Sequence, residues 1–340
     1  MTAVEEFITR MPKAELHVHL EGSMQPRTLL QLARRHHVAL PADDLEGVRR
    51  WYQFRDFDHF IQIYMVISSC LRTAEDIELL AREFLEEQAR QNIRYTEVTF
   101  TPYNQFFNNG LGFDEQLEAV NRARTWAEQA LGVRMAVIMD IPRAIPPAEG
   151  DRIAGWAERG YGNGIIALGL GGPEIGNPPE KYTHAFARMR AAGIPCILHA
   201  GETEGPKSIW SALQVADSKR IGHGVRAIED ESLVAFLRER QIPLEVCPSS
   251  NICLKVFPSL AEHSLPRLMD AGLYITINSD DPPMFNTTLT DEYLLGHRTW
   301  GWDRGQIEKL VLNAVDAALL PTEEKTGLRA AFEAEFARLV

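Results

Sequence analysis

The sequence predicts an α/β protein folded as one closed (β/α)8 barrel, and three observations support this fold class. Eight short segments are rich in Val, Ile, Leu and aromatic residues, as strands are, and the longer stretches between most of them have the apolar spacing of helices. Strands that alternate with helices form a parallel sheet, and eight such units close into a barrel. A chain of 340 residues accommodates one such domain with insertions.

The predicted strands are distributed over most of the chain. They cover residues 15–20, 95–100, 133–141, 165–170, 196–199, 220–223, 244–247 and 274–278. The alternative is an open, doubly wound sheet, which usually carries a glycine-rich phosphate-binding turn after its first strand. Glu21-Gly22-Ser23, which follows the first strand here, is not such a turn, so the barrel is favoured.

The stretch between the first two strands is much longer than one crossover helix needs, so we expect a helical insertion at about residues 24–92. Its helices are predicted at 26–38, where Pro26 suits the first turn, at about 57–67, and at 73–91. In the middle helix, apolar residues recur at helical spacing, namely Phe57, Phe60, Ile61, Tyr64, Met65 and Ile67. Two interpretations of this face stay open: it packs into the core, or it forms a lid that gives a substrate an apolar wall.

The later helices complete the expected outer ring of the barrel. Helices are predicted at 114–131 and 179–192, and residues 301–340, rich in Ala, Leu and Glu, are expected to add extra C-terminal helices. The sequence contains no internal repeat and no linker. We therefore expect residues 1–340 to form a single domain.

Composition and charge limit the classes of function. Apolar residues make up 45% and charged residues 24%, which is ordinary for a globular protein. A net charge of −12 repels phosphate backbones and anionic lipids, so we expect a small substrate and neither nucleic acid nor a membrane as a partner. Four scattered cysteines and an N-terminus unlike a signal peptide favour a cytoplasmic protein with reduced thiols. The oligomeric state is left open.

Three predicted strands end in side chains that can bind a metal. His17 and His19 lie two residues apart in the first strand, so they point to the same face; alone, such a pair could equally be hydrogen-bonded core histidines. His199 ends the fifth strand, and Asp280 follows the eighth, which adjoins the first when a barrel closes. Three imidazoles and one carboxylate suit Zn²⁺ with room for a water, and iron, cobalt or manganese are alternatives.

A metal of this kind lowers the pKa of bound water from about 15.7 to about 7, so the site then needs a proton donor and groups that hold the hydroxide. Glu202, three residues after His199, is expected to shuttle the proton. His223, at the end of the sixth strand, and Asp281, beside Asp280, are candidates for holding the hydroxide. Their alternative roles are a structural histidine between two glycines and a helix cap before two prolines.

The other histidines lie away from the predicted strand ends and are expected to be structural or solvent-facing. They are His36, His37, His59, His184, His263 and His297. Cys247 and Cys253 match no common zinc-binding spacing, which favours buried structural thiols.

Five stretches carry a resemblance to a known family. They are MPKAELHVHLEGS at 11–23, HAGE at 199–202, RIGHG at 220–224, VCPSSN at 246–251 and NSDDP at 278–282. In this order, and spread over nearly the whole chain, they are similar to the motifs of the adenosine/adenine deaminase family of the metal-dependent amidohydrolases. The signature of cytidine and nucleic-acid-base deaminases, His-x-Glu with Pro-Cys-x-x-Cys, is absent.

The resemblance implies a distorted (β/α)8, or TIM, barrel with one Zn²⁺ per chain bound by His17, His19, His199 and Asp280. It implies a hydrolytic deamination in which Glu202 protonates purine N1 while a hydroxide held by His223 and Asp281 attacks C6, and ammonia leaves. The backbone of Gly172 is expected to contact purine N3, and Asp281 is also expected to contact the substrate.

Two positions bear on which purine is the substrate. Glu21 stands where familiar adenosine deaminases have an Asp that contacts the ribose 5′-hydroxyl, and where members that act on free adenine tend to have Glu. Gly222, in contrast, matches the corresponding motif of the nucleoside deaminases. A side chain in its place is expected to take up space or add charge near the ribose. Adenosine, 2′-deoxyadenosine and free adenine are thus all candidates, and a 5′-modified adenosine such as 6-amino-6-deoxyfutalosine reconciles both residues.

Two alternative hypotheses compete with the deaminase interpretation. Another amidohydrolase acting on an amide or ester would often use two metals bridged by a modified lysine on the fourth strand, and 165–170 contains no lysine. A catalytically silent binding barrel would have no physical need for buried ionisable groups such as Glu202, His223 and Asp281 at the strand ends.

Overall fold

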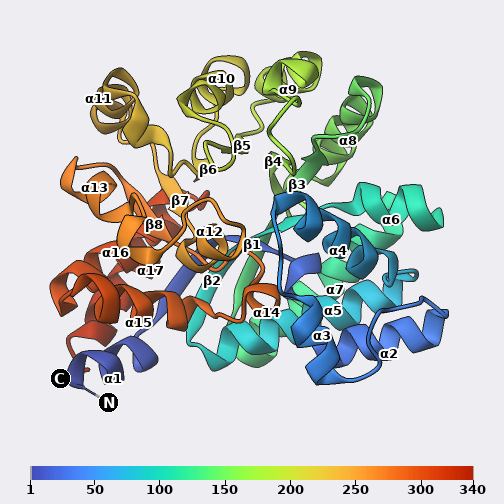
Figure 1. Cartoon of the computed structure of the whole chain (residues 1–340), viewed down its shortest axis with the longest axis horizontal. Coiled ribbons are helices and arrows are strands. Elements are labelled where there is room, and N and C mark those ends of the chain that lie inside the picture. Colours follow the sequence, from blue (N-terminus) through green and yellow to red (C-terminus); the bar gives the residue numbers. More distant parts are fainter. Residues whose placement is uncertain (1, 340) are drawn as a thin grey trace.

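The computed structural model describes residues 2–339, and its centre is an eight-stranded parallel sheet in the order β1 to β8 (Figure 1). The strands are β1 (Lys13–His19), β2 (Ile93–Phe100), β3 (Arg134–Pro142), β4 (Ile165–Gly171), β5 (Cys196–Ala200), β6 (Ile221–His223), β7 (Leu244–Val246) and β8 (Ile275–Ile277). Each predicted strand forms at its predicted place, with helices between successive strands. The (β/α)8 fold class is therefore confirmed.

The barrel closes between β8 and β1 without a regular ladder. Val18 and Asp280 form an isolated parallel bridge, in which the backbone N–H of His19 donates to the carbonyl of Asp280 at 2.8 Å. The Asn278 side chain reinforces this seam, because its Oδ1 accepts from the backbone N–H of His17 at 3.0 Å. The segment after β8 is thereby fixed directly beside the end of β1.

The insertion after β1 contains four helices. They are α2 (Pro26–His36), α3 (Leu45–Trp51), α4 (Phe57–Ser69) and α5 (Ala74–Arg90). The last of these packs against α7 (Phe113–Leu131) and β2, so it serves as the first helix of the outer ring, while α4 packs against α6 (Pro102–Asn109). The predicted helices at 26–38, 57–67 and 73–91 are present; α3, a short helix capped by the Asp44 side chain, was not predicted.

The remaining helices lie around the barrel or, like α12 and α14, directly after the carboxyl ends of its strands. They are α8 (Pro147–Gly160), α9 (Thr183–Ala192), α10 (Pro206–Ala216), α11 (Glu231–Arg240), α12 (Pro248–Cys253), α13 (Leu265–Asp270) and α14 (Pro282–Phe285), followed by α15 (Leu289–Trp300), α16 (Arg304–Ala317) and α17 (Thr322–Phe336). The predicted helix at 179–192 begins as a 3₁₀ turn, Pro179–Tyr182, before α9. The C-terminal helices cover the seam, because α16 packs against both β8 and β1.

Both ends of the chain lie on the same side of the barrel (Figure 1). The N-terminal helix α1 (Ala3–Arg10) packs against α15 and α16, and the Phe7 ring lies 5.6 Å from the Phe336 ring of α17. Within residues 2–339, no helix combines the length and the apolar composition that crossing a lipid bilayer requires.

Candidate active site

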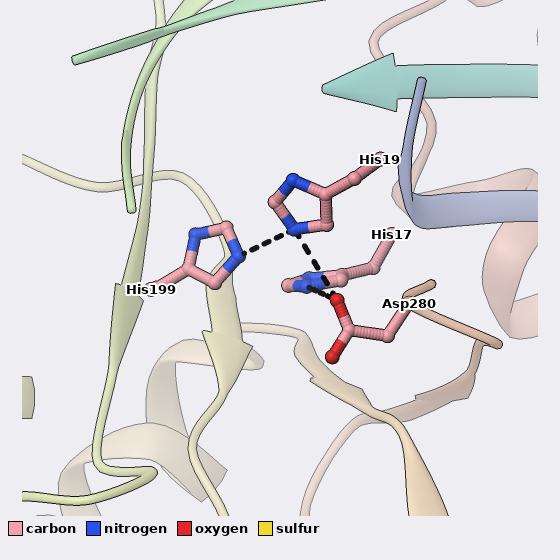
Figure 2. Close-up of side chains that lie close together, drawn as sticks. All are labelled: His17, His19, His199 and Asp280. Carbon is pink, nitrogen blue, oxygen red and sulfur yellow. Dashed lines mark hydrogen bonds and ion pairs between the residues drawn. The ribbon is translucent and has the colours of Figure 1, made fainter. Parts of the chain in front are cut away.

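The four predicted metal ligands come together at the carboxyl ends of the strands (Figure 2). His19 Nε2 lies 3.1 Å from His199 Nε2 and 3.2 Å from Asp280 Oδ1, and His17 Nε2 lies 3.5 Å from the same oxygen. One donor atom from each side chain lies within 4.8 Å of the other three. Three nitrogens and one oxygen thus face a common point, as the strand-end pattern predicted.

A buried ion network orients His17. Its Nδ1 contacts Glu245 Oε2 at 2.9 Å, and Glu245 is paired with the Arg220 guanidinium, which also binds Glu97 at 2.6 Å. All four side chains are buried. His17 Nε2 therefore faces the cluster, where it is buried without a hydrogen-bond partner. A buried nitrogen that lacks a partner, backed by a carboxylate on the other ring nitrogen, fits a metal ligand.

Asp280 is held in an unusual conformation. Ser250 Oγ donates to Asp280 Oδ2 at 2.7 Å, which leaves Oδ1 for the histidines. The backbone of Asp280 is left-handed, with φ of 64°, and His223 has φ of 61°. Such backbone costs about 1–3 kcal/mol at a non-glycine residue and tends to occur at functional sites. Elsewhere in residues 2–339, non-glycine residues with positive φ follow the ends of helices, whereas these two lie at strand ends and are predicted to act on the metal or the attacking water.

A second close group of possible donors consists of His223, Cys247 and Asp280. Burial raises the pKa of the Cys247 thiol well above its usual value, so the neutral thiol is favoured. Cys247 Sγ also lies 3.6 Å from the Glu245 carbonyl. These features agree with the predicted structural role of this cysteine.

Glu202 lies in the turn after β5 and is nearly fully buried. Its Oε1 has no hydrogen-bond partner, and its Oε2 lies 3.7 Å from His223 Nε2. Burial, followed by the negative charges of Asp280 and Glu174, raises the pKa of Glu202 well above its usual value. A raised pKa favours the protonated carboxyl group, which can donate a proton to a substrate, the role predicted for Glu202.

Glu174, which the sequence analysis did not single out, holds the turn that carries Glu202. Its carboxylate accepts from the backbone N–H groups of Gly201 at 2.9 Å, Glu202 at 2.9 Å and Thr203 at 2.8 Å. Burial opposes its ionisation, but the Arg143 charge and these hydrogen bonds lower the pKa of Glu174 below its usual value. The only signal in the sequence was its place at the end of the fourth strand, two residues after Gly172.

His223 and Asp281 are both buried beside the cluster. His223 Nε2 lies 3.8 Å from Asp280 Oδ2, and Asp281 Oδ1 has no hydrogen-bond partner. Burial and then the charge of Asp280 raise the pKa of Asp281 well above its usual value. The Asp281 side chain leaves no room for a side chain at position 22, because a Cβ on Gly22 would lie 1.5 Å from Asp281 Oδ1.

A cavity of about 460 Å³ lies over these residues. Its floor is formed by His19, His199, Glu202, His223, Asp280 and Asp281. Its outer wall is formed by Phe57, Phe60, Ile61, Tyr64 and Met65 of α4 and by Tyr103 and Phe107 of α6. The predicted aromatic face of the insertion thus contributes to the cavity wall, while Phe60 also packs on Phe285 in the core. A larger cavity of about 920 Å³, beside α14, contains none of the predicted site residues.

Asp140 is a cavity residue that the sequence analysis missed. It lies near the end of β3, is nearly fully buried, and leaves Oδ1 without a hydrogen-bond partner. Burial raises the pKa of Asp140 to about 7. The facing strand makes room for it, because a Cβ at Gly169 would lie 2.7 Å from its Oδ1. A lone acidic residue in the otherwise apolar stretch 135–141 was the available signal.

The predicted substrate-contact residues fall into two groups. Gly172 lines the cavity with φ of 94°, a conformation that favours glycine. Glu21 is fully buried in the 3₁₀ turn Glu21–Ser23, where it accepts from Thr101 N–H at 3.0 Å and from Tyr64 O–H at 3.3 Å, and it is not part of the cavity lining. Its direct contact with a ribose remains a prediction.

Gly222 lies directly beside two of the predicted metal ligands. A Cβ at this position would lie 2.9 Å from His17 Cε1 and 3.1 Å from His199 Cα. Gly222 therefore makes room for the metal ligands in the barrel interior, and it is not part of the cavity lining. A side chain there would take up space, as expected, while its effect on a ribose remains a prediction.

The other histidines stay outside the metal cluster. His36 is paired with the buried Asp76 at 2.6 Å, and His184 contacts Asp151 at the surface. His263 is buried and hydrogen-bonded to Asn251 at 3.1 Å. Among residues 2–339, none of the six belongs to a group of potential metal donors, as predicted.

Known proteins resemble this chain over nearly its whole length. The adenosine deaminase family model matches residues 12–334. An aminodeoxyfutalosine deaminase from Streptomyces avermitilis is 40% identical over 331 residues, which cover 96% of this chain and 92% of that protein. An adenine deaminase from Stutzerimonas stutzeri is 36% identical over 316 residues, which cover 93% and 99%. The crystal structure of adenine deaminase from Arthrobacter aurescens matches with a TM-score of 0.91 and 30% identity, covering 96% and 99%.

The residues matched by the family model include every strand end that carries a predicted site residue. The converging histidines also agree with this match, because the adenosine deaminase-like amidohydrolases are metal-dependent. The chain therefore belongs to the adenosine deaminase family, and it is a hydrolase that acts on a carbon–nitrogen bond of a cyclic amidine.

Proposed function

We propose that this enzyme deaminates a 6-aminopurine nucleoside with an enlarged 5′ substituent, such as 6-amino-6-deoxyfutalosine, to the 6-oxopurine and ammonia. The observation that carries the proposal is the composition of the cavity. Three buried carboxyl groups, those of Asp140, Glu202 and Asp281, line the cavity, and each has one buried oxygen without a hydrogen-bond partner. Beyond them, an apolar wall continues to Phe107, whose side chain is 72% exposed at the protein surface.

A purine nucleoside matches this arrangement of polar and apolar groups. Unpaired buried oxygens are costly unless a ligand supplies partners, and a purine with ribose hydroxyls offers several. The aromatic part of a 5′ substituent would cover the aromatic wall of the cavity. The 40% identity to an aminodeoxyfutalosine deaminase supports the same substrate class.

The residues at the floor have distinct roles in the proposed reaction. Protonated Glu202 donates to purine N1, which makes C6 more electrophilic. His223 and Asp281 hold the attacking water, and the Gly172 backbone and Asp281 position the purine. The four-residue cluster would hold one Zn²⁺, which when bound lowers the pKa of water from about 15.7 to about 7 and so supplies the nucleophile.

Free adenine is the second candidate substrate. It is supported by the 36% identity to an adenine deaminase and by the burial of Glu21 behind Tyr64 and Thr101, which takes it out of the cavity lining. Adenine has no ribose, so it would leave both the Asp140 oxygen and the outer wall without a partner.

An ammonia-release assay of the zinc-loaded enzyme separates the candidates. It would compare adenosine, 2′-deoxyadenosine, adenine and a 5′-aryl-substituted adenosine at equal concentrations. We expect the highest kcat/KM for the 5′-substituted nucleoside. A preference for adenine would establish the second candidate instead, and no release from any of the four would contradict the deamination of these purines.

A further inference from the structure

His223 is linked to two buried residues on the side of its ring that faces away from Glu202. Asn251 Nδ2, on α12, lies 3.3 Å from His223 Nδ1, and Asn251 Oδ1 lies 3.1 Å from His263 Nε2. The backbone N–H of Leu265 reaches His263 Nδ1 at 3.0 Å. Asn251 and His263 are 0% and 3% exposed, so water does not compete for these hydrogen bonds.

The backbone N–H of Leu265 lies at one end of this series of hydrogen bonds and determines the direction of each of them. A backbone N–H can only donate, so His263 Nδ1 must accept, and the neutral ring then carries its proton on Nε2. Burial lowers the pKa of His263 to about 4, which favours this neutral form. His263 Nε2–H therefore donates to Asn251 Oδ1. This fixes the side-chain amide, whose Nδ2–H is left to donate to His223 Nδ1.

The same logic assigns the proton on His223. Because Nδ1 accepts from Asn251, a neutral His223 ring carries its proton on Nε2. That nitrogen lies 3.7 Å from Glu202 Oε2 and 3.8 Å from Asp280 Oδ2, at the cavity floor. The N–H thus points to the space between the proton donor and the metal-binding carboxylate.

We propose that Asn251 and His263 are positioning residues that lock His223 in its Nε2–H form, so that His223 donates a hydrogen bond to the attacking oxygen and does not accept its proton. This inference rests on the proposed function for its catalytic consequence, but the proton assignment itself needs no substrate. Its physical basis is the pair of buried hydrogen bonds that would be broken or reversed if the His223 proton moved to Nδ1.

The surroundings of His263 keep the chain of hydrogen bonds rigid. The His263 ring packs 4.5 Å from the Phe257 ring and 5.8 Å from the Trp300 ring. Asn251 is also anchored through its backbone, whose N–H donates to the Cys247 carbonyl at 3.1 Å. Neither side chain belongs to the cavity lining, so we expect their substitution to act on the substrate through His223 and not by direct contact.

Asn251→Asp tests the proposal with almost no change of shape. The carboxylate still accepts from His263, but it cannot donate to His223, so it draws the His223 proton to Nδ1. We expect kcat to fall by about 100-fold or more, as when a catalytic histidine is held in the wrong tautomer, with a much smaller change in KM. Zinc content and the thermal unfolding midpoint identify a variant that has simply failed to fold.

His263→Gln and His263→Leu form a matched pair for the second link. The Gln amide can replace the Nε2–H donor, whereas Leu fills similar space and frees the Asn251 amide to rotate. We expect kcat near that of the wild type for His263→Gln and a loss of about tenfold for His263→Leu, comparable to losing one buried hydrogen bond. Equal kcat for the two variants would overturn the positioning role of His263.

The direct readout is ¹⁵N NMR of histidine-labelled enzyme in its zinc-loaded form, with the His223 signals identified from a His223→Gln variant. We expect the His223 proton on Nε2 in the wild type and on Nδ1 in Asn251→Asp. A wild-type proton on Nδ1, or Asn251→Asp with unchanged kcat, would overturn the inference. If the tautomers are as expected but no purine is deaminated, the proposed function fails while the proton assignment stands.

Discussion

On the floor of the active-site cavity, functional side chains sit at strand ends and are held by a second buried group. Glu245 fixes the His17 ring, and Ser250 fixes the Asp280 carboxylate. On the outer wall, the side chains come from α4 and α6 outside the barrel, and Phe107 is largely exposed. The reaction requires catalytic atoms at fixed positions, whereas binding an apolar substituent requires only an apolar surface of sufficient area and matching shape. We therefore propose that the barrel frame controls the reaction and that the insertion and α6 control the size of the substrate.

Removing a metal ligand should have the largest effect on the floor. His199→Ala is expected to lower kcat/KM by roughly 10⁴-fold or more, because the pKa of the attacking water returns toward about 15.7 when the metal is lost. Zinc content by elemental analysis should fall together with ammonia release. The matched control is His184→Ala, which removes a surface histidine paired with Asp151 and should change neither quantity. Full zinc occupancy in His199→Ala would contradict the ligand assignment.

Removing the proton donor should have the second-largest effect on activity. Glu202→Gln is expected to lower kcat by about 10²- to 10⁴-fold while zinc content stays unchanged. The raised pKa also predicts a pH dependence: the active form is the protonated one, so wild-type kcat/KM should decline as pH rises through the Glu202 pKa. Glu204→Gln, two residues later, is the control. Near-normal turnover of Glu202→Gln would remove the proton-donor role.

Asp140 lies where the floor meets the wall, and its substitution should have an intermediate effect that depends on the substrate. Asp140→Ala is expected to lower kcat/KM for the nucleoside by about 10- to 100-fold, the range for one hydrogen bond to a carboxyl group. If this group binds a ribose hydroxyl, the loss should disappear for the 2′-, 3′- or 5′-deoxyadenosine that lacks it, and for adenine. A loss of equal size on all substrates would show that Asp140 does not contact the ribose.

The wall should give the smallest effect. Phe107→Ala is expected to raise KM for a 5′-aryl-substituted adenosine by about three- to tenfold, because it removes part of an apolar contact area. KM for unsubstituted adenosine should not change. Ile175→Ala removes another exposed apolar side chain that does not line the cavity and serves as the control. An equal rise in KM for both nucleosides would place Phe107 outside the 5′-substituent site.

The sequence predicted the floor better than the wall, for a physical reason. Parallel strands of a barrel bring their carboxyl ends to one face, so His17, His19, His199 and Asp280 could be expected to converge without knowledge of any contact. An aromatic helical face, in contrast, has the same pattern whether it covers a core or a cavity. The structure shows that α4 does both, since Phe60 packs in the core and also lines the cavity.

The missed features depend on long-range packing or on local backbone geometry. Glu174 acts through backbone hydrogen bonds to a turn 27 or more residues away, and Asn251 meets His223 across 28 residues. The orientation of Gly222 toward the metal ligands has a local cause. Neighbours in a regular strand face opposite sides, but the left-handed backbone of His223 lets Gly222 face the His17 ring while His223 still reaches the cavity floor.

The most direct test of this division of labour is the ratio of kcat/KM for a 5′-aryl-substituted adenosine to that for adenosine, measured in the wild type, Glu202→Gln and Phe107→Ala. If the floor performs the chemistry and the wall selects the substituent, Glu202→Gln should slow both substrates and leave the ratio unchanged, and Phe107→Ala should lower the ratio. A ratio that collapses in Glu202→Gln, or that is unaffected in Phe107→Ala, would contradict the separation of the two regions.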